Sequence, residues 1–252
     1  MNINTDINIL GGLPDWGLIK YYYEKKYDLI SGKEETSIKT KKSIRRFKRA
    51  IEETFISFKN EKIKILFDSL IRNEGISKDF LYFLFWNASI NNDLLHAINM
   101  NVYFEAFYSG RVALKNEEVS SYLNELKISE PQLQKWTLNT INTTASKYLT
   151  LLKKIGLLEG KQIKSILHPF LNDKMFIIFI YWLTAFEESS NLLKSEWLKY
   201  GFMETELLLE RLKKKSFSKY FYVYYTGDKL KIETIIEYEQ VYEIISRDIH
   251  SN

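Results

Sequence analysis

The sequence predicts a mainly α-helical protein: a helical bundle with a helix-turn-helix of winged-helix character in its middle region and a β-hairpin near the C-terminus. Three observations support this prediction. The 252 residues include only ten glycines and three prolines, which favours long helices over a β-sandwich with many turns. Apolar residues recur at three- and four-residue spacing through most of the chain. Near residue 220 the pattern changes to that of strands.

The order of these patterns predicts three regions. They are residues 1–115, an N-terminal helical domain with a basic helix; 116–168, the helix-turn-helix region; and 169–252, C-terminal helices with the hairpin.

The hydrophobic fraction of 45% is enough for a folded core. There is no cysteine, which excludes disulfides, thiol nucleophiles and cysteine-ligated metals and agrees with a reducing cytoplasm. The net charge of +4 indicates little by itself, because clustering matters more than the sum.

The sequence does not predict a membrane protein. Its beginning lacks the basic-then-apolar order of a signal peptide. The most apolar run, residues 175–186, is twelve residues long and has charged residues on both sides, whereas a spanning helix needs about twenty. We therefore expect a buried core helix there, a cytoplasmic protein and no membrane partner.

The N-terminal region is predicted to begin with an extended lead-in over residues 2–13 that turns at Gly11-Gly12. A helix is predicted over 16–29. A strong amphipathic helix follows over 43–58, and its predicted core face carries Ile44, Phe47, Ile51, Phe55 and Phe58.

A dense basic cluster precedes and overlaps the first half of this amphipathic helix. Seven cations fall within eleven residues that contain no acid: Lys39, Lys41, Lys42, Arg45, Arg46, Lys48 and Arg49. A helix N-terminus also favours anions, so a phosphate backbone would be attracted twice. We interpret the cluster as a surface for a polyanion. The alternative is a solvated basic face that Glu52 and Glu53 balance one turn later.

The middle of the chain reads as further helices that lead to the helix-turn-helix. Helices are predicted over 61–73, 76–87 and 91–109, and one over 116–126 would be the first helix of a three-helix winged unit. The helix-turn-helix follows over 129–160 as a short helix, a turn at Trp136-Thr137 and a longer helix. Thr137 is the expected N-cap, and Gly156 lies where a C-terminal glycine belongs.

The longer helix has two chemically different faces. The predicted buried face carries Ile141, Ala145, Tyr148, Leu149, Leu152 and Ile155. The opposite face carries Asn139, Thr140, Asn142, Thr143, Ser146, Lys147 and Thr150 and ends in Lys153 and Lys154. Small polar groups can hydrogen-bond base edges and cations can reach phosphates, as in a recognition helix. The alternative is a packed helical hairpin with a solvated face. The predicted DNA-binding residues are the seven cations of the basic cluster with Asn139, Thr140, Asn142, Thr143, Lys147, Lys153 and Lys154.

The rest of the chain is predicted to contain a wing and a closing hairpin. Short apolar pieces after Gly156 predict a small hairpin, or wing, in which Lys161 and Lys164 could touch a backbone. Helices are expected over 173–186, 190–200, 203–215 and 238–249. Between the last two, strands over 220–225 and 229–236 would flank a turn. The aromatic strand is interpreted as half-buried, with nucleobase stacking as the alternative.

No catalytic motif is recognisable. The phosphate-loop, dinucleotide-binding, zinc-protease and serine-hydrolase patterns are missing, and His96, His168 and His250 lie in unrelated contexts without metal-ligand spacing. We therefore expect a protein that is not an enzyme and holds no cofactor or metal.

Three stretches taken together resemble the BrxA family, components of BREX bacteriophage-defence systems. They are INILGGLPDWGLIKYYYEKKYDLI from residue 7, TKKSIRRFKRAIEETF from residue 40 and WTLNTINTTASKYLTLLKKIGLLEG from residue 136. Their order and spacing are similar to the family's. Its usual Trp-Ser-x-x-Thr, followed by a helix ending in Gly-Leu-Leu, is matched by Trp136, Thr137 in place of serine, Thr140 and Gly156-Leu157-Leu158. The resemblance covers about residues 7–170. It implies an all-α protein with a NusB-like helical part and winged-helix character that binds DNA without enzymatic activity.

Three functional hypotheses follow. The leading one is a non-catalytic component of a BREX phage-defence system that binds double-stranded DNA mainly through phosphate contacts. The second is an adaptor whose basic surface docks an acidic partner among the other BREX proteins. The third is an RNA-binding protein, which the NusB-like resemblance and the aromatics near basic residues suggest.

Overall fold

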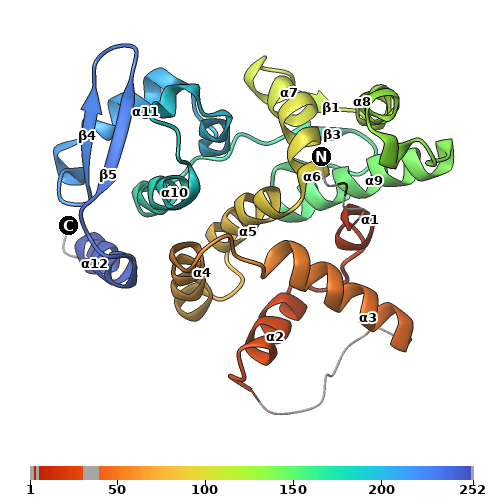
Figure 1. Ribbon diagram of the computed structural model, residues 1–252, viewed down its shortest axis with the longest axis horizontal. Helices are drawn as coiled ribbons and strands as arrows, with labels where there is room; N and C mark the ends of the chain where they lie inside the picture. The colour runs from red at the N-terminus through yellow and green to blue at the C-terminus, as the bar shows by residue number, and fades with distance from the viewer. Residues whose placement is uncertain (1–2, 4–5, 31–39, 251–252) are drawn as a thin grey trace. The chain divides into compact units, whose positions relative to one another are not determined.

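The computed structural model describes residues 3, 6–30 and 40–250 and confirms a mainly α-helical protein (Figure 1). The chain forms two compact units, each built from two segments. Unit 1 comprises residues 1–57 and 76–168, and unit 2 comprises 58–75 and 169–252. The three regions predicted from the sequence stay a prediction, and the two units are described separately.

The first helices of unit 1 are α1 (Ile7–Leu10), α2 (Gly17–Lys26) and α3 (Lys41–Ala50). The extended lead-in predicted over residues 2–13 is wrong for α1. Its single turn forms because Ile7 and Leu10 lie on one side and are both fully buried. In α1 it is this burial, rather than any capping side chain, that stabilises the helix.

Helix α3 is half in the core and half outside it. The Thr40 side chain caps its start by accepting from the Ser43 N–H, and a π-helical turn (Ile51–Phe55) continues it. Ile51 and Phe55 are fully buried, as the apolar pattern predicted, but Ile44 and Phe47 are only half-buried. The basic first half of α3 therefore projects beyond the core.

Helices α5 (Lys78–Asn91) and α7 (Phe104–Tyr108) supply most of the aromatic core of unit 1, and α6 (Asp93–Ile98) between them adds aliphatic side chains. The sequence predicted one helix over 91–109. The structure interrupts it, because the Asn92 side chain caps α6 by accepting from the Leu95 N–H, and a π-helical turn (Asn99–Tyr103) separates α6 from α7. That turn places the Asn99 side chain in the buried interior.

A winged helix completes unit 1. Its elements are β1 (Ala113–Leu114), α8 (Asn116–Ser129), a 3-10 turn (Pro131–Leu133), α9 (Leu138–Ile155), β2 (Leu158–Glu159) and β3 (Lys164–Ile166). The sheet order is β1-β3-β2, and both pairings are antiparallel. The predicted wing is thus confirmed as β2 and β3. The sequence predicted the helix at 116–126 as the first helix of the winged unit, and it forms as α8; the strand β1, which precedes α8 and pairs with β3, was not predicted.

Unit 2 packs α4 (Glu61–Glu74) against α10 (Asp173–Phe186) and α12 (Tyr238–His250). Helix α10 is buried along almost its whole length, as predicted. Helix α11 (Thr205–Leu212) and the hairpin of β4 (Phe221–Tyr225) and β5 (Leu230–Thr234) follow, and the hairpin confirms the C-terminal strand prediction. The helix predicted over 190–200 is wrong: the Asn191 and Ser195 side chains cap two short 3-10 turns there. Among the described residues, no helix is long and apolar enough to cross a membrane.

Candidate nucleic-acid interface

Helix α9 presents a polar ridge on the surface of unit 1, and local signals fix both of its ends. The Thr137 hydroxyl accepts from the Thr140 N–H at 3.2 Å, and Gly156 adopts the left-handed conformation with φ of 89°. The predicted buried face is confirmed: Ile141, Ala145, Tyr148, Leu149, Leu152 and Ile155 are all buried. On the opposite face Asn139, Asn142, Thr143 and Ser146 are exposed, while Thr140, Lys147 and Thr150 are half-exposed.

A buried polar network holds α9 in place. The Tyr148 hydroxyl donates to Asn99 Oδ1 at 2.8 Å, and Asn99 Nδ2 donates to the Ser89 hydroxyl at 3.0 Å. The network therefore connects α9 with the π-helical turn and α5. Because hydrogen bonds are directional, it fixes the rotation of α9 about its axis more strictly than apolar packing alone. The ridge is presented from a rigid support.

The polar side chains of the ridge differ in how far they are already used. Asn142 Oδ1 accepts from the Ser120 hydroxyl of α8 at 3.2 Å, and the Thr140 hydroxyl lies 3.1 Å from that of Thr137. The side chains of Asn139 and Thr143 make no hydrogen bond to any residue that the structure describes. These two groups remain available to an external ligand.

The two lysines at the end of α9 are engaged by backbone carbonyls. Lys153 Nζ donates to Gly160 O at 2.8 Å and ties the helix to the wing. Lys154 Nζ donates to Gly11 O at 3.1 Å and to Leu13 O, just after α1. Burial and, secondarily, the charge of Lys147 lower the pKa of Lys154. Although both were predicted to contact phosphate, the structure gives each of them a role within the fold.

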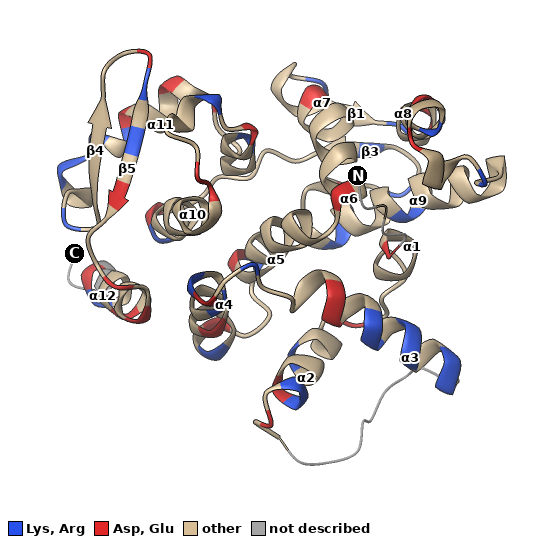
Figure 2. Ribbon diagram, viewed as in Figure 1, with Lys and Arg blue, Asp and Glu red and all other residues tan. Residues whose placement is uncertain are grey.

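The cations of α3 divide into two groups, those with an acidic partner and those without one. Lys48 pairs with Glu52 at 3.7 Å, and Arg49 pairs with Asp6 at 3.4 Å and with Glu53 at 3.8 Å. Lys41, Lys42, Arg45 and Arg46 are exposed and form no ion pair with any described residue. Figure 2 shows this basic end of α3. Lys39, the first residue of the predicted cluster, lies outside the described residues.

We call Lys48, Arg49, Lys153 and Lys154 the anchored cations, because each has an intramolecular partner. We call Lys41, Lys42, Arg45, Arg46 and Lys147 the open cations, because none has a hydrogen-bonding or ionic side-chain partner in the described part of the chain. The sequence grouped all nine together with Lys39. The structure separates them.

Helix α1 contacts both α3 and α9 and so connects the basic helix with the helix that carries the ridge (Figure 1). A β-carbon at Gly11 would overlap the backbone carbonyl of Lys147, so the lack of a side chain at Gly11 allows α1 to approach α9 closely. Beside this contact, a groove of about 290 Å³ is bordered by Arg46 of α3 and Lys147 of α9. Arg46 and Lys147, 101 positions apart in the sequence, are thus brought together.

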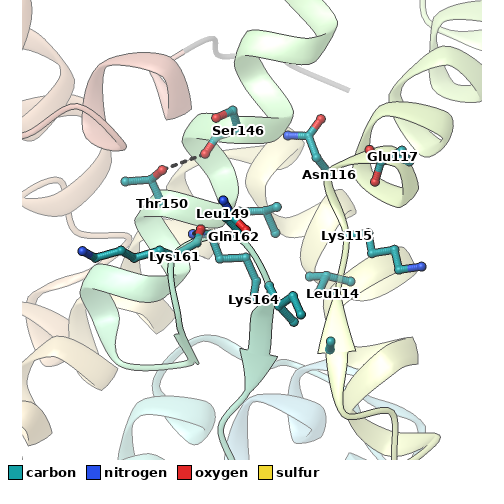
Figure 3. Close-up of a pocket in the computed structure, with 12 residues that line it drawn as sticks. Leu114, Lys115, Asn116, Glu117, Ser146, Leu149, Thr150, Lys161, Gln162 and Lys164 are labelled. Atoms are coloured by element: carbon teal, nitrogen blue, oxygen red, sulfur yellow. Dashed lines mark hydrogen bonds between the residues drawn. The ribbon is translucent and has the colours of Figure 1, made fainter.

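A second groove, of about 520 Å³, lies on the other side of the ridge (Figure 3). Ser146, Leu149 and Thr150 of α9 form one wall, and the start of α8 and the turn between β2 and β3 form the others. Lys161 lies at the wing turn and is exposed, whereas Lys164 Nζ donates to the backbone of that turn.

Sequence reasoning missed several residues of this second groove, namely Lys115, Asn116 and Gln162. It also did not identify Ser43 and Gly12 as residues of the α3 groove. The two-residue strand β1 gives no periodic signal, so nothing local indicated that the start of α8 would face the wing.

The short helix predicted from residue 129 is wrong: the 3-10 turn is all that forms there, and α8 takes its place as the helix before α9. The fold and this surface define a protein with a winged helix in which α8 and α9 form a helix-turn-helix and α9 carries an exposed polar ridge beside the cations of α3. The BrxA family matches residues 38–179, from just before α3 into α10. The chain belongs to the BrxA family and is accordingly a component of a BREX phage-defence system. No curated protein matches the sequence.

Proposed function

We propose that the protein is a non-catalytic, double-stranded-DNA-binding component of its BREX system, and that α9 lies in the major groove while the open cations contact phosphates on the side of α3. One observation carries this proposal: an exposed polar helix ridge runs between two grooves, and two of the open cations, Arg46 and Lys147, line one of them. The major groove of B-DNA is about 12 Å wide and admits one α-helix.

The chemistry of the ridge fits base edges in that groove. The free side chain of Asn139 matches the donor and acceptor pair that adenine presents there, and the Thr143 methyl and hydroxyl groups fit thymine or a polar edge. The A-form major groove of double-stranded RNA is deep and too narrow for such entry. Duplex DNA is therefore favoured over duplex RNA as the ligand.

The open cations supply sequence-independent affinity. Each phosphate that they neutralise releases a counterion, so binding should weaken steeply with salt. Lys48 and Arg49 add little to this effect, because their charges are already compensated by Glu52, Glu53 and Asp6. Binding should thus depend on few of the basic residues.

The test is the affinity of the purified protein for a labelled duplex, measured by fluorescence anisotropy at several salt concentrations. Arg45→Glu/Arg46→Glu should weaken binding about 100-fold, since each lost charge-assisted contact contributes about 1.5 kcal/mol or more. The matched control is Lys194→Glu/Lys229→Glu, which makes the same change in net charge at exposed positions of unit 2. Equal losses for the two pairs would contradict the proposed site.

Single-stranded DNA and RNA of equal length serve as competitors in the same experiment. If RNA competes as well as the duplex, the α9 geometry is not what selects the ligand. A wild-type protein that binds no nucleic acid at low salt, but is retained by another BREX protein after nuclease treatment, would favour the adaptor function instead.

A further inference from the structure

The groove between α1, α3 and α9 has a composition that the proposed function does not by itself require. Arg46 and Ser43 enter it from α3, Lys147 enters it from α9, and Gly12 lies two residues after the end of α1. Ile9 and Phe47 supply its apolar surface. Three elements from distant parts of the sequence thus place two cations and a hydroxyl group around one space.

The position of Lys147 in this groove is set by the close packing of α1 on α9. A β-carbon on Gly12 would lie 3.6 Å from Lys147 Nζ, so the ammonium group lies beside the glycine backbone. Lys154, seven residues later, is held by the carbonyls of Gly11 and Leu13. The turn after α1 is therefore bordered by two ammonium groups.

No carboxylate compensates this charge inside the groove. Among the described residues that line it, none is acidic. Asp6, at the start of α1, is only 1% exposed and is paired with Arg49. The wing groove differs, because Glu117 is part of its lining. The α3 groove is the one with uncompensated positive charge.

Like charges that converge without a counter-ion favour an external anion. A guanidinium group, an ammonium group and a hydroxyl group are the donors that bind phosphate oxygens in proteins, and arginine can do so through two parallel hydrogen bonds. The groove is open to solvent, so it can accept a phosphate that remains attached to a longer chain.

We propose that this groove is a phosphate-binding subsite in which Arg46, Lys147 and Ser43 bind one phosphate group together. The inference rests on the proposed function for the source of that phosphate, which is the backbone of a duplex whose major groove holds α9. Arg46 and Lys147 then contact the same phosphate and not two separate ones. Loss of either cation removes most of the benefit of the other.

A double-mutant cycle on duplex affinity tests this directly. Arg46→Gln and Lys147→Gln should each weaken binding about tenfold, and the double variant should be only slightly weaker than either, far from the about 100-fold loss of independent sites. The salt slope should fall by about one phosphate contact in all three variants. Arg45→Gln, on the same helix but outside the groove, should combine additively with Lys147→Gln.

Additive losses for Arg46 and Lys147 would show that the two cations do not share a phosphate. The proposal that the protein binds duplex DNA would still stand in that case. Thermal unfolding of each variant shows that it remains folded, which is expected since neither side chain has a hydrogen-bonding or ionic partner among the described residues.

A second arm separates this subsite from the proposed function. Inorganic phosphate should raise the midpoint of thermal unfolding of the wild-type protein, relative to chloride at equal ionic strength, more than that of the double variant. If the duplex fails to bind but this difference is present, the proposed function is wrong and the groove takes a free phosphate compound. If both arms fail, the subsite is wrong as well.

Discussion

Arg46 and Arg49 lie three residues apart on α3, and Lys147 and Lys154 lie seven residues apart on α9, yet one member of each pair is open and the other anchored. Arg49 pairs with Asp6 and Glu53, and Lys154 holds the carbonyls that follow α1. Arg46 and Lys147 face a groove without acids among its described lining residues. The comparison shows that the role of a cation depends on which acid or carbonyl the fold places beside it, and not on the density of basic residues in the sequence.

The largest expected effect on stability belongs to Lys154. Lys154→Met keeps the aliphatic stem but leaves two partly buried carbonyls without their donor, which should lower the free energy of unfolding by about 2 to 3 kcal/mol. Urea denaturation measures the change. The control, Lys153→Met, removes only an exposed hydrogen bond and should cost less than about 1 kcal/mol. A loss below about 1 kcal/mol for Lys154→Met as well would show that the carbonyls after α1 need no donor.

The buried and exposed polar groups of α9 should differ in the same sense. Tyr148→Phe removes the buried hydrogen bond to Asn99 and should destabilise the protein by about 1 to 2 kcal/mol. Thr143→Val changes an exposed side chain and should leave stability within about 0.5 kcal/mol while altering affinity for particular duplex sequences. Denaturation curves and anisotropy on the two variants compare the faces. The comparison breaks if Thr143→Val proves the more destabilising change.

Replacing Lys147 should weaken duplex binding without lowering stability, the reverse of what is expected for Lys154. Lys147→Gln is expected to weaken duplex binding about tenfold while the midpoint of urea unfolding stays unchanged, because no described residue forms a hydrogen bond or ion pair with its ammonium group. Isothermal titration with duplex and denaturation of the same preparation give both values. Destabilisation without weaker binding would move Lys147 to the anchored group.

The smallest expected effect is on the titration of Lys154. Its pKa should lie below the ordinary value of 10.5, mainly through burial and in part through the Lys147 charge, so Lys147→Gln should raise it. Because the unfolded chain then binds more protons than the folded one just below pH 10.5, this lysine makes the protein more stable as pH rises through that interval. Carbon-13 NMR of labelled lysine side chains follows the shift. An unchanged Lys154 pKa in the variant would show that the two charges do not interact.

Much of the surface could be predicted from local signals. The Thr137 cap, the Gly156 end and the apolar period between them located α9 and its polar face, and the apolar run before Glu187 located α10. Each of these signals lies within the element that it specifies, so the sequence alone carries it.

The features that were missed depend on contacts between distant residues. Helix α1 forms because Ile7 and Leu10 are buried, and Gly11 matters because the Lys147 carbonyl lies against it. The pairing of Arg49 with Asp6 joins residues 43 positions apart. No local pattern distinguishes Arg49 from Arg46, so the separation into anchored and open cations required the structure.

The most direct test of the account compares two neighbouring cations of α3 by the salt dependence of duplex binding. The slope of log K against log salt should become less steep by about 0.9 for Arg46→Gln, since one phosphate contact is lost. It should stay unchanged for Lys48→Gln, because Glu52 already compensates that charge. Equal changes in the two variants, or a larger change for Lys48→Gln, would contradict the division between open and anchored cations.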